Sequence, residues 1–189
     1  MSRFIYIASD YPLYARPNPH EKMMSVNEAI SAGVANIPDF LLNDDFDKDK
    51  PDIVMVSDRN IDINIDTGVI SDGDFDDDFN IWILDESLVL KSNKKYFAVL
   101  EWHRLTYVRA DNIIKYIADT LENTDEVELW HIWLGAEDQY HSLKTKRLPL
   151  SELTAEHIIQ FEKLKPWDDI IINDILSTGI NIVATKDLD

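Results

Sequence analysis

The segment VELWHIWLG, residues 127–135, restricts the fold more than any other part of this chain. If it is written as a β-strand, Leu129 and Trp133 lie on one face, and Trp130 and Ile132 lie on the other. Alternate side chains of a strand point to opposite faces of its sheet, so this strand has to be covered on both faces. The sequence therefore predicts a central strand inside a layered structure.

Other segments predict the elements around this strand. Period-two alternation or short apolar runs predict strands at 3–9, 53–57, 61–66, 79–84, 96–102, 141–148 and 180–186. Amphipathic spacing predicts helices at 109–123 and 151–165. A short helix should begin at Ser25 in a capping box with Glu28 and end at Gly33. This order predicts an α+β fold with a mixed, mainly antiparallel sheet of about six to eight strands and two to four helices.

Length and composition indicate one folded domain over residues 1–189. Within it, 39–52 is an acidic, loop-rich segment and 72–78 is an acidic turn. No cysteine is present, which excludes disulfides, thiolate metal sites and a cysteine nucleophile. No apolar run approaches the roughly 20 residues that span a bilayer, so a soluble, cytoplasmic protein is expected.

Negative charge is concentrated in one part of the sequence. The formal net charge is −18, and the stretch 39–86 holds sixteen acidic residues against three basic ones. Such a surface repels nucleic-acid backbones and anionic lipid, and it attracts cationic partners. We therefore expect a basic protein partner, no direct contact with nucleic acid and no membrane binding.

The expected partner-binding residues are the carboxylates of the strand 61–66 and of the acidic turn, namely Asp62, Asp66, Asp74, Asp76, Asp77 and Asp78. Carboxylates fixed on a rigid strand can imitate a phosphate backbone or cover a basic active site. Asp and Gly also favour a solvated turn for purely local reasons. No cofactor is predicted, and the alternative to a docking surface is a Ca²⁺ or Mg²⁺ site formed by Asp72, Asp74, Asp76 and Asp78.

An enzyme is the competing function class. Glu101 and His103 share one face of the strand 96–102, extended by one residue, and His131 lies in the tryptophan-rich central strand. If these two strands were neighbours, a Glu and a His could meet as a general acid–base pair. The alternative is that His131 is an ordinary core histidine. With five glycines, the chain has no phosphate-binding glycine motif, and no nucleophile elbow occurs.

The extended loop at 11–22 supplies a further set of contact residues, Tyr11, Tyr14, Arg16 and His20, which could serve an interface or pack a proline-rich crossover. Taken together, the patterns favour an interaction module, or an inhibitor of the kind that neutralises a basic protein, over a Glu/His ligand-binding protein or hydrolase. A divalent-cation-binding domain is the third possibility.

Overall fold

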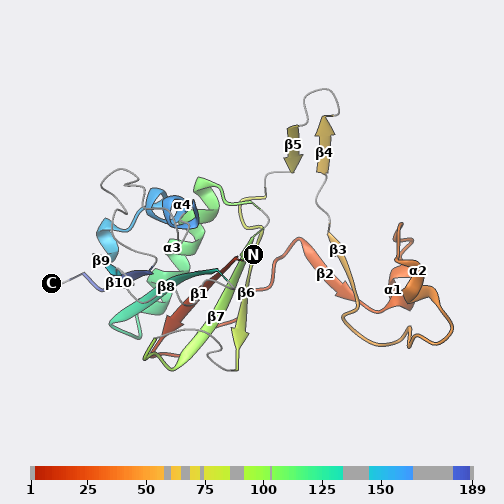
Figure 1. Cartoon of the computed structure of the whole chain (residues 1–189), viewed down its shortest axis with the longest axis horizontal. Coiled ribbons are helices and arrows are strands. Elements are labelled where there is room, and N and C mark those ends of the chain that lie inside the picture. The colour runs from red at the N-terminus through yellow and green to blue at the C-terminus, as the bar shows by residue number, and fades with distance from the viewer. Residues whose placement is uncertain are drawn as a thin grey trace. The chain divides into compact units, whose positions relative to one another are not determined.

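A computed structural model gives the fold in Figure 1. It describes residues 3–57, 61–64, 69–72, 75–85, 92–102, 104–133, 145–163 and 181–187. The chain divides into two compact units: unit 1 comprises Met1–Pro17 and Asp76–Asp189, and unit 2 comprises Asn18–Phe75. The sequence patterns predicted one domain over 1–189 and did not anticipate that unit 2 interrupts unit 1.

Unit 1 is built on a six-stranded sheet with the order β6-β7-β1-β8-β10-β9. Its strands are β1 (Arg3–Ser9), β6 (Phe79–Leu84), β7 (Tyr96–Trp102), β8 (Glu126–Trp133), β9 (Thr145–Pro149) and β10 (Asn181–Thr185). Only β9 and β10 pair in parallel; the other four pairs are antiparallel. The α+β class and the mixed, mainly antiparallel sheet are confirmed. β8 lies between β1 and β10, so the central strand predicted at 127–135 is confirmed as well.

Two helices, α3 (Tyr107–Leu121) and α4 (Ala155–Lys163), pack on one face of this sheet, and a single-turn helix, η2 (Leu150–Glu152), precedes α4. The core between helices and sheet includes Ile7, Leu129 and Ile182 from the strands and Ile117 and Phe161 from the helices. α3 begins earlier than its apolar spacing suggested, because the Thr106 hydroxyl accepts a hydrogen bond from the Arg109 amide and so caps the helix.

Unit 2 is a smaller structure. It contains a two-stranded sheet of β2 (Glu21–Met24) and β3 (Val54–Ser57), the helices α1 (Val26–Ser31) and α2 (Asp39–Leu42), and the hairpin of β4 (Ile61–Asn64) and β5 (Val69–Asp72). Its core is formed by Met24, Val26, Ala29, Leu41 and Val54. The predicted capping box is confirmed: Ser25 and Glu28 exchange hydrogen bonds, and Gly33 takes a φ of 72° just after the helix.

Neither unit contains, within its described residues, a helix long and apolar enough to cross a bilayer.

Candidate functional site

The structure separates the residues of the predicted acid–base pair. β1 lies between β7 and β8, and its Ile5 pairs with Leu100 on one side and with His131 on the other. Directly paired residues share a face, so His131 lies on the face of Leu100, while Glu101 points to the opposite face. Glu101 accepts a hydrogen bond from Trp82 Nε1 at 2.8 Å. His103 lies outside the described residues.

His131 belongs to the core. Its side chain is 1% exposed, its Nδ1 donates to the carbonyl oxygen of Phe161 at 3.0 Å, and its ring lies 5.6 Å from the Phe161 ring. Glu101 and His131 therefore do not form a Glu/His site, and His131 instead links β8 to α4.

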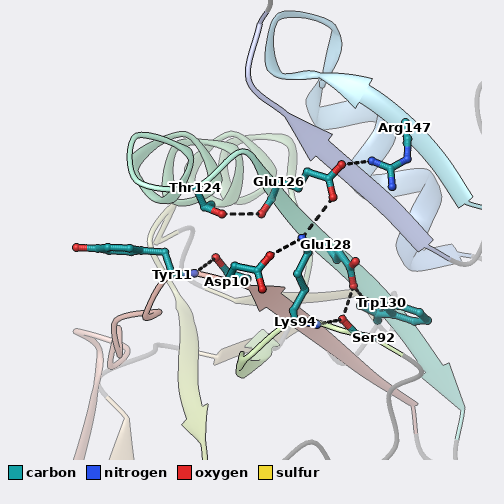
Figure 2. A network of polar contacts seen from close by, with 10 residues as sticks. Asp10, Tyr11, Ser92, Lys94, Thr124, Glu126, Glu128, Trp130 and Arg147 are labelled. Atoms are coloured by element: carbon teal, nitrogen blue, oxygen red, sulfur yellow. Dashed lines mark hydrogen bonds and ion pairs between the residues drawn. The ribbon is translucent and has the colours of Figure 1, made fainter.

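A different glutamate does lie beside tryptophan. Glu128, on β8, accepts hydrogen bonds from Ser92 Oγ at 2.6 Å and from Trp130 Nε1 at 2.7 Å, both at its Oε2 atom. Figure 2 shows this group at one end of the sheet. Alternation along β8 puts Glu128 and Trp130 on one strand face, but the sequence carries no signal for Ser92, which is thirty-six residues away from Glu128 in the chain.

The same sheet end carries a chain of ion pairs (Figure 2). Lys94 Nζ lies 2.9 Å from Asp10 Oδ2 and 3.3 Å from Glu126 Oε2, and Arg147 pairs with the other oxygen of Glu126. Burial lowers the pKa of Lys94, but its two hydrogen-bonded carboxylates outweigh that effect and the pKa is raised. Burial raises the pKa of Glu126, but Arg147 and Lys94 outweigh it and the pKa is lowered. These groups stabilise one another in the charged form and fasten the start of β7 to β1 and β8.

The acidic turn is divided between the surface and the interior. Asp76 is exposed and Asp77 is half-buried, whereas Asp78 is 0% exposed and its Oδ2 lies 3.4 Å from Nη2 of Arg109, itself 1% exposed. The prediction that Asp78 belongs to an exposed docking surface is therefore corrected: its carboxylate faces a buried guanidinium.

Backbone carbonyls of this turn are held by unit 1. Arg16 donates from Nη2 to the Asp77 carbonyl at 3.0 Å and from Nη1 to the Phe79 carbonyl at 2.6 Å, and its guanidinium lies 3.5 Å from the centre of the Phe79 ring. Burial lowers the pKa of Arg16, while Asp77 acts in the opposite direction. Asn112 donates to the Asp76 carbonyl at 3.0 Å. Arg16 thus binds carbonyl oxygens of its own chain.

Two of the remaining predicted contact residues, Tyr14 and His20, pack within their units. The Tyr14 ring lies 4.3 Å from that of Tyr116, whose hydroxyl donates to the Tyr14 carbonyl, and His20 stacks on Phe75 at 3.8 Å. Tyr11 is exposed. Asp62 and Asp72 lie on β4 and β5, and Asp66 and Asp74 lie outside the described residues.

No group of three or more His, Asp or Glu side chains is arranged to hold a metal ion in the described ranges. Of the four residues in the predicted cation site, Asp76 is exposed and Asp78 is buried against Arg109, so these two do not converge.

A dense run of exposed carboxylates lies in the segment 39–52 of unit 2. We call it the acidic surface; its six carboxylates are all exposed and belong to Asp39, Asp44, Asp45, Asp47, Asp49 and Asp52. Its basic residues are Lys48, which lies 3.9 Å from Asp44, and Lys50. The sequence pattern identified this segment as acidic, but the partner-binding residues were predicted between Asp62 and Asp78.

The acidic surface is fixed to α1. Asn27 donates from Nδ2 to Asp49 Oδ1 at 2.8 Å and from its backbone amide to the Lys48 carbonyl at 3.1 Å. The capping-box hydrogen bonds from Ser25 lower the pKa of Glu28, which keeps that carboxylate ionised. A shallow groove between α1 and the segment is lined by Glu28, Asp49 and Pro51, among others. Glu28 and Asp49 are therefore held in place by hydrogen bonds, and an ion pair within the segment joins Lys48 to Asp44.

Comparison with protein-family models, with curated proteins and with solved structures finds no match for this chain, so its function has to be argued from the geometry above.

Proposed function

We propose that this protein is an interaction module that binds a basic protein partner through unit 2, in the manner of an inhibitor that neutralises a cationic surface. The observation that carries the proposal is the charge of unit 2. Residues 18–75 hold thirteen acidic side chains against four basic ones, in a compact unit of their own.

The way in which these charges are held supports binding. In unit 1, the cations of Lys94, Arg147 and Arg109 each pair with a carboxylate. The acidic surface holds six aspartates and two lysines, Lys48 and Lys50. Fixed, exposed carboxylates steer a cationic partner and raise its association rate without needing to reorganise.

The same charge opposes two other partner classes. A phosphate backbone and an anionic lipid headgroup both carry negative charge and are repelled by a surface of this sign. A basic protein is the class of macromolecule whose charge complements unit 2.

The first experiment is capture of partners with the tagged full-length protein from nuclease-treated lysate at low salt, followed by elution at high salt and mass spectrometry. We expect a basic protein in stoichiometric amount, released by salt because screening weakens contacts between exposed charges. Recovery of acidic proteins only, or of nothing, would contradict the proposal.

A matched pair of variants then locates the contact. Asp44→Asn, Asp45→Asn and Asp47→Asn together remove three charges from the acidic surface, and the control, Asp85→Asn, Asp111→Asn and Glu122→Gln, removes three exposed charges from unit 1. The first variant should slow association about tenfold at low salt, and the control should change it little, because steering depends on charge near the contact. Equal effects of both variants would show that net charge, not unit 2, attracts the partner.

A further inference from the structure

One face of the small sheet in unit 2 exposes apolar side chains. Met23 on β2 pairs directly with Met55 on β3, and their side chains are 41% and 59% exposed. The neighbouring pair, Met24 and Val54, points the other way and is buried in the core of the unit. The outer face also carries Glu21 and Ser57, so an exposed apolar pair lies there beside polar side chains.

This pattern is unusual for a small sheet with one wet face, where the outer positions are normally polar. Methionine is flexible and polarizable, and it is enriched at interfaces where one surface has to adapt to a partner. Other large apolar side chains of the same unit are exposed as well, namely Ile30, Phe40 and Leu42. Unit 2 thus combines exposed apolar groups with a strong excess of carboxylates.

We infer that the face formed by Met23 and Met55, which we call the methionine face, binds a basic amphipathic segment of the partner protein. This inference rests on the proposed function and adds the chemistry of the partner: cationic side chains for the carboxylates of unit 2, and an apolar stripe for the methionines. Charge complementarity selects this occupant. A second copy of the chain would bring two surfaces of the same sign together, since residues 18–75 carry thirteen acidic and four basic side chains.

Two synthetic peptides of equal length and charge separate the two contributions. One is a Leu/Lys peptide whose leucines form one face of a helix, and the other is a Gly/Lys peptide without an apolar face. The full-length protein should bind the Leu/Lys peptide more tightly, and the difference should persist at high salt, because apolar contact is not screened.

The test variant is Met23→Ser with Met55→Ser, and the control is Ile30→Ser, which removes an exposed apolar side chain from α1 of the same unit. The double variant should bind the Leu/Lys peptide roughly tenfold more weakly, as expected when the exposed parts of two methionines are no longer buried. Its binding of the Gly/Lys peptide should be unchanged, as should both affinities of the control. Unaltered circular dichroism and thermal unfolding of each variant confirm that unit 2 is folded.

The outcomes distinguish this inference from the proposal beneath it. If neither peptide binds the wild-type protein at low salt, the proposed function fails and this inference fails with it. If both peptides bind in a salt-dependent way and the double methionine variant binds each as the wild type does, the acidic surface remains the contact and the methionine face is excluded. Loss of Leu/Lys binding in the double variant alone supports the methionine face.

Discussion

At the scale of single residues, the pair of Asp78 and Arg109 shows how one sequence pattern can hold two kinds of carboxylate. Asp76 and Asp78 stand two positions apart in the acidic turn, yet one is exposed and the other is fully buried 3.4 Å from a buried guanidinium. A run of aspartates predicts a solvent-exposed turn. It does not show that one of them, Asp78, is buried beside Arg109, which lies thirty-one residues later in the chain.

The burial of this pair predicts unequal effects of two similar substitutions. Asp78→Ala removes the carboxylate 3.4 Å from the buried Arg109 guanidinium and should lower the free energy of unfolding by about 3–5 kcal/mol. Asp76→Ala, at an exposed position in the same turn, should change it by less than about 0.5 kcal/mol. Urea unfolding of the two variants measures both values, and similar midpoints would show that the pair does not stabilise the fold.

At the scale of elements, helix caps and apolar patterns could be predicted from the sequence, whereas the pairing of strands distant in the chain could not. The cap of α1 needs only Ser25, Glu28 and Gly33, all within nine positions, so it could be predicted from sequence. The central position of β8 could also be predicted, because both of its faces are apolar. Nothing local shows that β1 lies between β7 and β8, and this one fact of strand order separates Glu101 from His131.

The start of α4 is capped by a titratable side chain, that of His157. Thr154 precedes the helix, and its backbone amide donates to Nδ1 of His157 at 3.2 Å while the His157 amide donates back to the Thr154 carbonyl. The imidazole takes the place that Glu or Gln has in a capping box. Because Nδ1 accepts this bond, the cap needs the neutral ring.

Burial and the nearby Lys146 lower the pKa of His157, against the opposing effect of Glu156 and Glu152. A group whose pKa is lower in the folded state stabilises the fold fully above its unfolded pKa of about 6.5, and this contribution is lost as pH falls through the folded pKa. We therefore expect the wild-type protein to lose more stability between neutral pH and pH of about 5 than His157→Gln, which keeps an acceptor for the Thr154 amide without a titrating ring.

Urea midpoints measured for both proteins across this pH range test the prediction, since carboxylates distant from position 157 titrate alike in the two proteins and cancel in the difference. Parallel pH profiles would show that His157 does not couple protonation to folding.

At the scale of the whole molecule, unit 2 is inserted in the sequence of unit 1, and the two unit 1 segments that flank it are hydrogen-bonded to each other. Arg16 stands just before the insertion, and its backbone exchanges hydrogen bonds with Ile81 at 3.0 and 2.8 Å, just after it. Its side chain holds the carbonyls of Asp77 and Phe79 from the same position. A sequence cannot show this closure, because Arg16 and Phe79 are sixty-three residues apart and no local pattern marks either as an end.

Because the segments before and after unit 2 already pair with each other through Arg16 and Ile81, unit 1 should fold without unit 2. Replacing residues 18–75 by a short Gly/Ser linker should leave a cooperative unfolding transition and slow amide exchange in β1 and β8. The linker only has to join two segments that the backbone of Arg16 already connects by hydrogen bonds to Ile81.

Arg16→Ala should lower the free energy of unfolding of unit 1 by about 2 kcal/mol, through lost charge-assisted hydrogen bonds and the cation–π contact. This loss should be similar in the full chain and in the shortened one, because the contacts of Arg16 with Asp77 and Phe79 lie within unit 1. If the shortened chain unfolds without cooperativity, or if Arg16→Ala affects only the full chain, the sheet of unit 1 depends on unit 2 and the two do not fold independently.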